Sequence, residues 1–116
     1  MTTEDLMVTN LLQVFGEKDP VRRRVVIERI YAENCTFIDP GKEIVGYDAI
    51  NTNVDELQAR FPNFVFKVVG QPSAHHDIGR LNWQYGPPDA PPAITGMDVV
   101  IIENDRIKTL YVFIDS

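Results

Sequence analysis

The chain has 116 residues, of which 44% are hydrophobic and 24% are charged, and its formal net charge is −6 with a pI of about 4.7. This length and composition predict one globular domain over residues 1–116 with an ordinary hydrophobic core. The acidic balance argues against nucleic-acid binding, which needs basic residues to neutralise phosphates. The one basic cluster, Arg22-Arg23-Arg24, is read as the solvated face of a helix.

Two further observations bear on where the protein resides. Cys35 is the only cysteine, so an internal disulfide is excluded and a reducing compartment is favoured. The start of the sequence, Met1–Asp5, lacks the basic and apolar regions of a signal peptide, and no apolar run reaches the length of a membrane span. We therefore expect a cytoplasmic protein without a membrane partner.

The first third of the chain predicts two helices. The first begins at Thr2 or Thr3, either of which can act as the N-cap, and ends at Gly16. The second begins at Asp19-Pro20, with Asp as the N-cap and Pro at the first helical position, and continues to Tyr31.

A short strand over 35–39 follows, in which Cys35, Phe37 and Asp39 alternate with Thr36 and Ile38. Alternate residues of a strand share a face, so Asp39 is expected to point into the apolar surroundings of Cys35 and Phe37.

The rest of the chain predicts a short strand, a third helix and a strand-rich half. Residues 43–45 form the short strand, and a helix over 48–60 has its apolar residues at intervals of three and four. Strands are predicted over 64–69, 75–85, 93–103 and 106–114, and Gly70 and Pro72 are taken to end the first of them. Helices first and an antiparallel meander afterwards define an α+β fold.

Two aspartates are the candidate catalytic residues. Asp98 lies in the middle of a predicted strand and shares a face with Gly96 and Val100, as Asp39 does with Phe37. Two carboxyl groups that open on one apolar cavity would have raised and separated pKa values, so that one donates a hydrogen bond while the other accepts a proton. The alternative is that each aspartate accepts hydrogen bonds from the backbone or an arginine and has a structural role.

Aromatic residues on the strands are candidate pocket walls. Trp83 and Tyr85 share a face with Leu81, and Tyr111 and Phe113 are expected to line the same cavity as Phe37. Plain core packing is the alternative.

His75 and His76 are neighbours on a predicted strand and so point to opposite faces. They cannot chelate one metal ion from a regular strand, and no metal site is predicted. His76 is expected either to face the pocket as a proton shuttle or to lie exposed at a strand start. The chain has no glycine-rich phosphate loop, Gly-x-Ser-x-Gly or His-Glu-x-x-His motif, so no cofactor is predicted.

Three stretches resemble the NTF2-like superfamily, in particular its SnoaL-like members: residues 31–40, residues 45–50 and residues 96–107. The resemblance covers nearly the whole chain. It implies a conical α+β fold in which three N-terminal helices pack in a strongly curved, mostly antiparallel sheet that encloses a pocket. It also implies a homodimer formed through the outer face of the sheet.

Ketosteroid isomerase is the closest chemical comparison within that superfamily. The resemblance assigns the catalytic base to Asp39 and a protonated hydrogen-bond donor to Asp98. The tyrosine that this enzyme contributes from its first helix has no counterpart in residues 9–15 of this chain.

These observations leave two hypotheses. The first is a cofactor-independent isomerase, cyclase or hydratase that acts on a small apolar molecule, with Asp39 as acid/base and Asp98, Tyr31 or His76 assisting. The second is a non-catalytic ligand-binding or dimeric scaffold module on the same pocket. The residues expected to bind the ligand in either case are Phe15, Tyr31, Phe37, His76, Trp83, Tyr111 and Phe113.

Overall fold

A computed structural model describes residues 1–115 of the chain. Its elements, in order, are α1 (Thr3–Thr9), the π-helix η1 (Asn10–Phe15), α2 (Pro20–Ile30), β1 (Tyr31–Asp39), β2 (Lys42–Val45), α3 (Tyr47–Arg60), β3 (Val65–His75), β4 (Ile78–Gly86), β5 (Ile94–Glu103) and β6 (Arg106–Ile114). Among the described residues, no helix has the length and hydropathy needed to cross a membrane.

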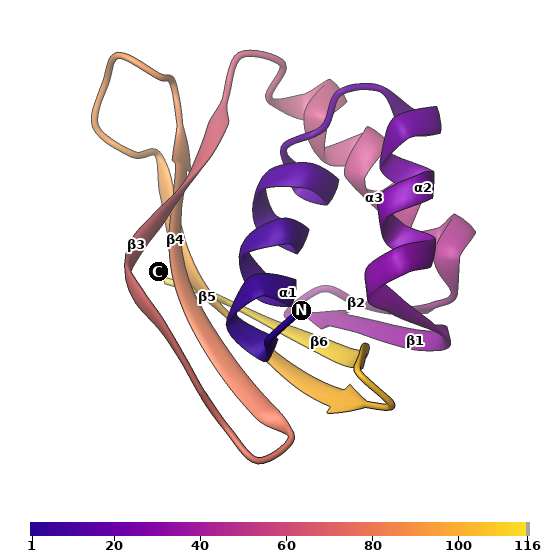
Figure 1. The fold of residues 1–116 in the computed structure, drawn as a ribbon. Helices are drawn as coiled ribbons and strands as arrows, with labels where there is room; N and C mark the ends of the chain where they lie inside the picture. Colours follow the sequence, from indigo (N-terminus) through magenta and orange to yellow (C-terminus); the bar gives the residue numbers. More distant parts are fainter. Residues whose placement is uncertain (116) are drawn as a thin grey trace.

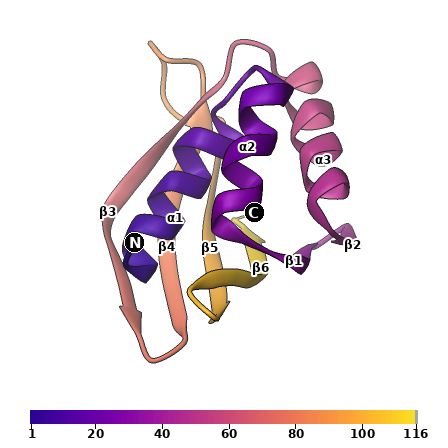
Figure 2. The same cartoon turned by 45° about the vertical axis from the view of Figure 1, so that its right-hand side comes forward.

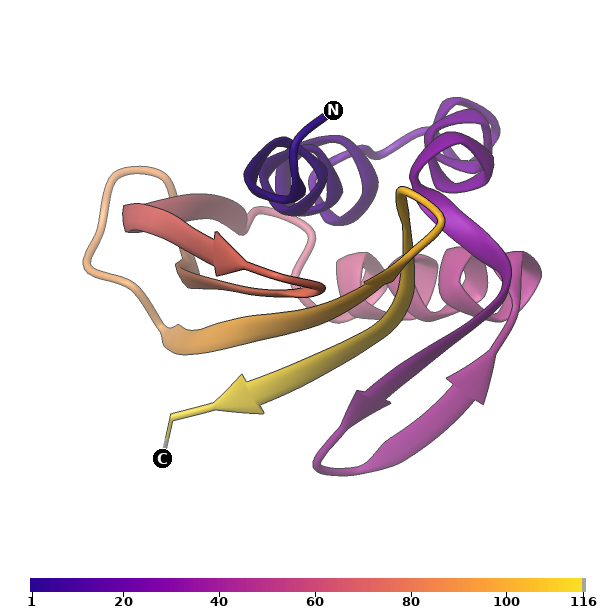
Figure 3. The same cartoon turned by 60° about the horizontal axis from the view of Figure 1, so that its bottom comes forward.

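The strands form one six-stranded sheet in the order β2-β1-β6-β5-β4-β3. All neighbouring pairs are antiparallel except β1 and β6, which are parallel. The sheet curves around the helices without closing, and α1 lies against its concave face (Figures 1 and 3). The predicted α+β cone of three helical regions in a strongly curved sheet is confirmed.

The hydrophobic core lies between the concave face and the helices. Its fully buried members come from every layer and include Val14, Ile27, Ile30, Val54, Val100, Ile107 and Leu110. Thr2 is the N-cap of α1, in agreement with the predicted cap at Thr2 or Thr3, and it forms a capping box with Asp5. Helix α1 continues directly into η1, and Gly16 is the C-cap of η1. Short π-helical segments are frequently found at functional sites, and η1 ends with Phe15.

The prediction that Gly70 and Pro72 end a strand is wrong. Strand β3 continues through both residues to His75, and its register with β4 shifts between Val69 and Ser73. Gly70 adopts a φ of 69°, which is favourable for glycine, and a bulge tolerates a proline because the ladder donor is interrupted there anyway. The β3–β4 turn consequently falls at His76 and Asp77, inside the region predicted as one strand.

Arg23 corrects the prediction of a solvated arginine cluster. Its side chain is 0% exposed, whereas Arg22 is exposed. The guanidinium donates hydrogen bonds to the Glu17 carbonyl and to the side chains of Asn51, Asp55 and Gln58, at distances between 2.8 and 3.0 Å. Because the last three residues belong to α3, Arg23 fastens α3 to α2, and Figure 2 shows these two helices side by side.

We expect Arg23→Met to lower the free energy of unfolding by roughly 3 kcal/mol, because the polar groups that surround a buried charge lose their partner. Arg22→Met, which removes an exposed arginine from the same turn, should change it by less than about 0.5 kcal/mol. Urea denaturation measures both values, and equal effects of the two substitutions would contradict the role of Arg23.

Candidate functional site

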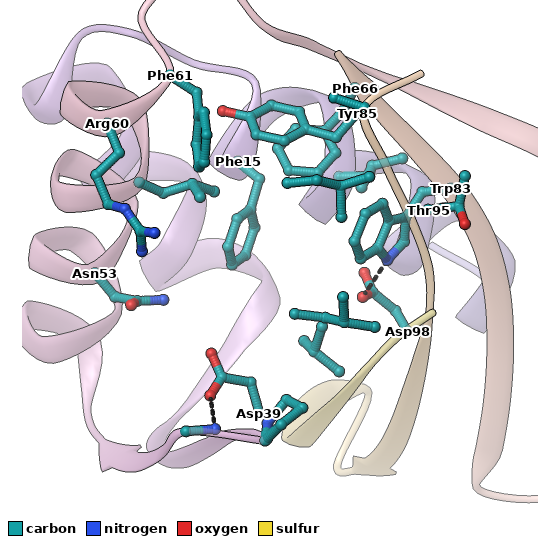
Figure 4. A pocket seen from close by; sticks show the side chains of 18 of the residues that line it. Phe15, Asp39, Asn53, Arg60, Phe61, Phe66, Trp83, Tyr85, Thr95 and Asp98 are labelled. Atoms are coloured by element: carbon teal, nitrogen blue, oxygen red, sulfur yellow. Dashed lines mark hydrogen bonds between the residues drawn. The ribbon is translucent and has the colours of Figure 1, made fainter. Parts of the chain in front are cut away.

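A cavity of about 760 Å³ lies between the concave face of the sheet and α3. Its lining is largely aromatic and aliphatic, with polar groups at a few positions (Figure 4). Its lining includes Phe15, Phe37, Asp39, Lys42, Asn53, Arg60, Phe66, Trp83, Tyr85, Asp98 and, at the end of β6, Asp115. A cavity of this size and composition is typical of small-molecule sites.

Asp98 lies on the inner face of β5, and its residue is only 5% exposed. Gly96 and Val100 share this buried face, as the strand alternation predicts. The indole Nε1 of Trp83 donates a hydrogen bond of 2.9 Å to Asp98 Oδ1. Burial raises the pKa of the Asp98 carboxyl to about 7, and the hydrogen bond from Trp83 opposes this shift only in part. Asp98 is therefore an acid that titrates near neutral pH inside an apolar cavity.

Gly96 explains how Trp83 reaches this position. Trp83 and Gly96 are cross-strand partners on β4 and β5. A Cβ atom at residue 96 would collide with the six-membered ring of the Trp83 indole and with the Phe113 carbonyl oxygen. The absence of a side chain therefore allows the indole to approach the Gly96 backbone, with its N–H directed at Asp98 (Figure 4).

Asp39 also lines the cavity, at the end of β1. Its Oδ1 accepts hydrogen bonds from the backbone N–H groups of Gly41 and Lys42, at 2.8 and 2.9 Å. The second carboxylate oxygen points into the cavity (Figure 4). One oxygen of Asp39 therefore accepts hydrogen bonds from the backbone, as expected for a structural role, while the other faces the pocket, as expected for a catalytic role.

An aromatic cluster forms one side of the cavity. Phe66 stacks on Tyr85 with 3.9 Å between ring centroids, and it meets Trp83 edge to face at 5.6 Å. Phe15 stacks on Phe37 at 6.0 Å. The predicted ligand-binding residues Phe15, Phe37 and Trp83 all line the cavity.

Tyr31 lies outside the cavity lining, which corrects its assignment as a ligand-binding residue. Its side chain is completely buried, and its hydroxyl donates a hydrogen bond of 2.5 Å to Asn10 Oδ1. Burial, followed by the nearby Asp98, raises the pKa of this hydroxyl well above its usual value. Tyr31 therefore joins β1 to the first helical segment from within the core.

Three other predicted ligand-binding residues lie away from the cavity. Tyr111 and Phe113 are 39% and 53% exposed on the opposite face of the sheet, since Val112 and Ile114 are the β6 residues that line the cavity. His76 is exposed in the β3–β4 turn with a φ of 52°, so it is no proton shuttle for this pocket. The predictions for Tyr111, Phe113 and His76 are wrong.

Polar residues of α3 were missed by the sequence analysis. Asn53 and Arg60 are seven residues apart, so they share a helix face, and both point into the cavity (Figure 4). The available signal was their position beside the apolar stripe of Val54, Leu57 and Phe61. Residues 1–115 contain no group of three or more His, Cys, Asp or Glu side chains arranged to hold a metal ion.

Comparisons with known proteins agree with this fold. The SnoaL-like domain family matches residues 8–110. The chain therefore belongs to the SnoaL-like domain family. No curated protein matches it in sequence.

Solved structures with the same fold extend this result. A proposed isomerase of the SnoaL-like family from Agrobacterium tumefaciens strain C58 is 29% identical over 100% of both chains, with a TM-score of 0.91. A proposed SnoaL-like polyketide cyclase from Jannaschia species CCS1 is 10% identical over 96% of this chain and 83% of that one, with a TM-score of 0.77. A proposed ketosteroid isomerase from Kribbella flavida is 13% identical over 98% and 78%, with a TM-score of 0.75.

The raised pKa of Asp98 predicts a pH-dependent stability. Between pH 4 and pH 7 the folded protein retains a proton that the unfolded chain releases, so the free energy of unfolding falls as the pH rises through this window. Asp98→Asn removes the titrating group and keeps an oxygen that can accept the bond from Trp83. We expect the variant to lose less stability than the wild type over this window, by a few kcal/mol, since one pKa unit corresponds to about 1.4 kcal/mol.

Urea denaturation at a series of pH values measures the effect. Asp89→Asn, which neutralises an exposed loop aspartate, is the control and should follow the wild-type curve. Parallel stability curves for the wild type and Asp98→Asn would show that folding does not raise the pKa of Asp98.

Proposed function

We propose that the protein is a cofactor-independent enzyme that moves a proton on a small apolar carbonyl compound, in the manner of an isomerase or cyclase. The observation that carries this proposal is the presence of two differently held carboxyl groups, Asp39 and Asp98, in one aromatic cavity. Pairs of carboxyl groups whose environments separate their protonation states are a recurring solution for acid/base catalysis.

The environments suggest different roles for the two groups. Asp39 is held by two backbone N–H groups, and its second oxygen is available to take a proton from a carbon next to the ligand carbonyl. Asp98 is held by one indole N–H and, because burial favours its protonated form, can donate a hydrogen bond to the oxygen of the enolate that results. Return of the proton from Asp39 to another carbon completes an isomerisation.

The relatives support the reaction class without fixing the substrate. The Agrobacterium protein is described as a proposed isomerase, and the more distant neighbours are described as a cyclase and a ketosteroid isomerase. Such a fold hosts several functions, so the proposal depends on the site rather than on the family.

Asp39→Asn should abolish proton transfer and leave ligand binding intact, because the substitution removes the basic oxygen and conserves size. The assay is deuterium incorporation next to the carbonyl of 2-tetralone in D₂O, followed by NMR. We expect the wild type to accelerate the exchange and the variant to lose at least about 100-fold, in line with the usual contribution of general-base catalysis.

Asp115→Asn is the matched control, since Asp115 also lines the cavity but its Oδ2 already accepts a bond of 2.7 Å from Thr95. Equal exchange rates in the wild type and Asp39→Asn would sink the assignment of the base. Saturable binding of 2-tetralone without any exchange would favour the non-catalytic binding module instead.

We also propose that the outer face of the sheet joins two copies of the chain. Tyr111 and Phe113 are exposed there, opposite Val99 and Met97 on β5, and Ile38 on β1 pairs with Tyr111. These residues form an apolar surface on the face away from the helices. A surface of this kind on a soluble protein is typical of an interface, and a two-fold axis would let it pack against itself.

Phe113→Lys should convert the dimer to a monomer, because two lysines would be buried in the apolar contact. Light scattering coupled to gel filtration at micromolar concentration measures the mass. Val21→Lys, which places the same charge at an exposed apolar residue of α2, should remain dimeric. A monomeric wild-type protein would refute this interface.

A further inference from the structure

The α3 wall of the cavity carries hydrogen-bond donors at Asn53 and Arg60. Asn53 is 8% exposed, and its Oδ1 accepts a hydrogen bond of 2.7 Å from the Lys42 ammonium. Because an ammonium group can only donate, this bond fixes the orientation of the Asn53 amide. The Nδ2 donor of Asn53 is then directed at the cavity, as Figure 4 shows.

Arg60 adds a positive charge on the same face of α3. Its guanidinium points into the cavity (Figure 4), and its Cζ lies 5.3 Å from the centroid of the Phe61 ring. Within residues 1–115, the ion pairs of the protein involve Arg22, Arg23 and Arg24 and leave Arg60 without an acidic partner. Glu56, one helical turn away, lines the cavity but is not paired with it.

The aspartate side chains on the sheet side of the cavity, unlike Arg60, already have hydrogen-bond partners. Asp39 Oδ1 accepts two backbone N–H groups, and Asp115 Oδ2 accepts the Thr95 hydroxyl. Asp98 is bonded to Trp83 and favours its neutral form, because burial raises its pKa. The α3 wall therefore carries one guanidinium without an acidic partner among residues 1–115 and one amide donor, whereas each of these carboxyl groups on the sheet side already accepts a hydrogen bond.

We propose that the natural ligand is an apolar carboxylic acid whose carboxylate is bound by Arg60 and Asn53, with its apolar body against Phe15, Phe66 and Trp83. This inference rests on the proposed function, because it supplies the recognition group that orients a carbonyl ligand toward Asp39 and Asp98. A guanidinium presents its donors in a planar fork that fits both oxygens of a carboxylate. A cation–π contact with Phe61 favours this position of the guanidinium before the ligand arrives.

The alternative to a carboxylate ligand is a cationic amine. An amine would be attracted by the aromatic rings and the carboxyl groups of the sheet side, but it would meet Arg60 across the cavity. A carboxylate finds an unpaired guanidinium and an amide N–H on one wall.

Three probes of one shape test the proposal: 1-naphthaleneacetate, its neutral amide and 2-(1-naphthyl)ethylamine. Isothermal titration calorimetry gives their dissociation constants for the full-length protein. We expect the wild type to bind the acid more tightly than the amide and the amine. Arg60→Gln should weaken the acid by about 10- to 100-fold, the usual effect of losing a charged hydrogen bond, and should leave the amide within about twofold.

Two further variants sharpen the result. Arg60→Lys keeps the charge without the fork, so its affinity for the acid should lie between those of the wild type and Arg60→Gln. Arg29→Gln, which removes an exposed arginine from α2, should bind all three probes as the wild type does. Retained binding of the amide shows that the Arg60 variants are folded.

The proposal is overturned if the wild type prefers the amine or the amide, if none of the probes binds, or if Arg60→Gln weakens the acid and the amide equally. Its failure is distinguishable from that of the proposed function. If deuterium exchange of 2-tetralone depends on Asp39 but the protein does not prefer the acid, the proposed enzyme activity stands and the carboxylic acid ligand is rejected. If the protein prefers the acid through Arg60 but catalyses no exchange, the carboxylic acid ligand stands and the proposed enzyme activity is rejected.

Discussion

The burial of the Arg23 guanidinium is the constraint on which the cavity depends. A buried cation has to satisfy its donors, and Arg23 does so with one carbonyl beside α2 and with a row of side chains on α3. That row, Asn51, Asp55 and Gln58, follows the helix period and occupies one face of α3. Because this face is held against α2, the opposite face of α3, which carries Asn53 and Arg60, is turned toward the cavity and the sheet.

The sheet side of the cavity is set by a second constraint, which is the lack of a side chain at Gly96. The space there admits the Trp83 indole, and the indole N–H donates a hydrogen bond to the Asp98 side chain. Asp39, by contrast, has two backbone donors on one oxygen. The two aspartate side chains thus face the same cavity with different numbers of hydrogen-bond donors. Acid/base catalysis by two carboxyl groups requires such a difference in environment, because one group has to give a proton and the other has to take one.

Period-two alternation in the strands let the sequence predict much of this site. Cys35 and Phe37 are buried together, and Gly96, Asp98 and Val100 share the inner face, because polar neighbours or glycine fixed the phase of those strands. On β6 both faces are apolar, so Tyr111 and Phe113 could not be distinguished from the residues that alternate with them. Arg23 was misread for another reason, since its partners lie about 30 residues further along the chain and no local pattern reports them.

The first helical region contributes no side-chain hydrogen-bond donor to the cavity. It lines the cavity with Leu11 and Phe15, whose side chains have no polar group. The hydroxyl of the nearby Tyr31 already donates its hydrogen bond to Asn10. The donors available to a ligand oxygen include Asp98 on the sheet, when this group is protonated, and Asn53 and Arg60 on α3. A ligand held by both walls would span the cavity with its apolar body across the aromatic cluster. Such a ligand needs two oxygen-bearing groups separated by an apolar frame, and this requirement restricts its chemistry more than the volume of the cavity does.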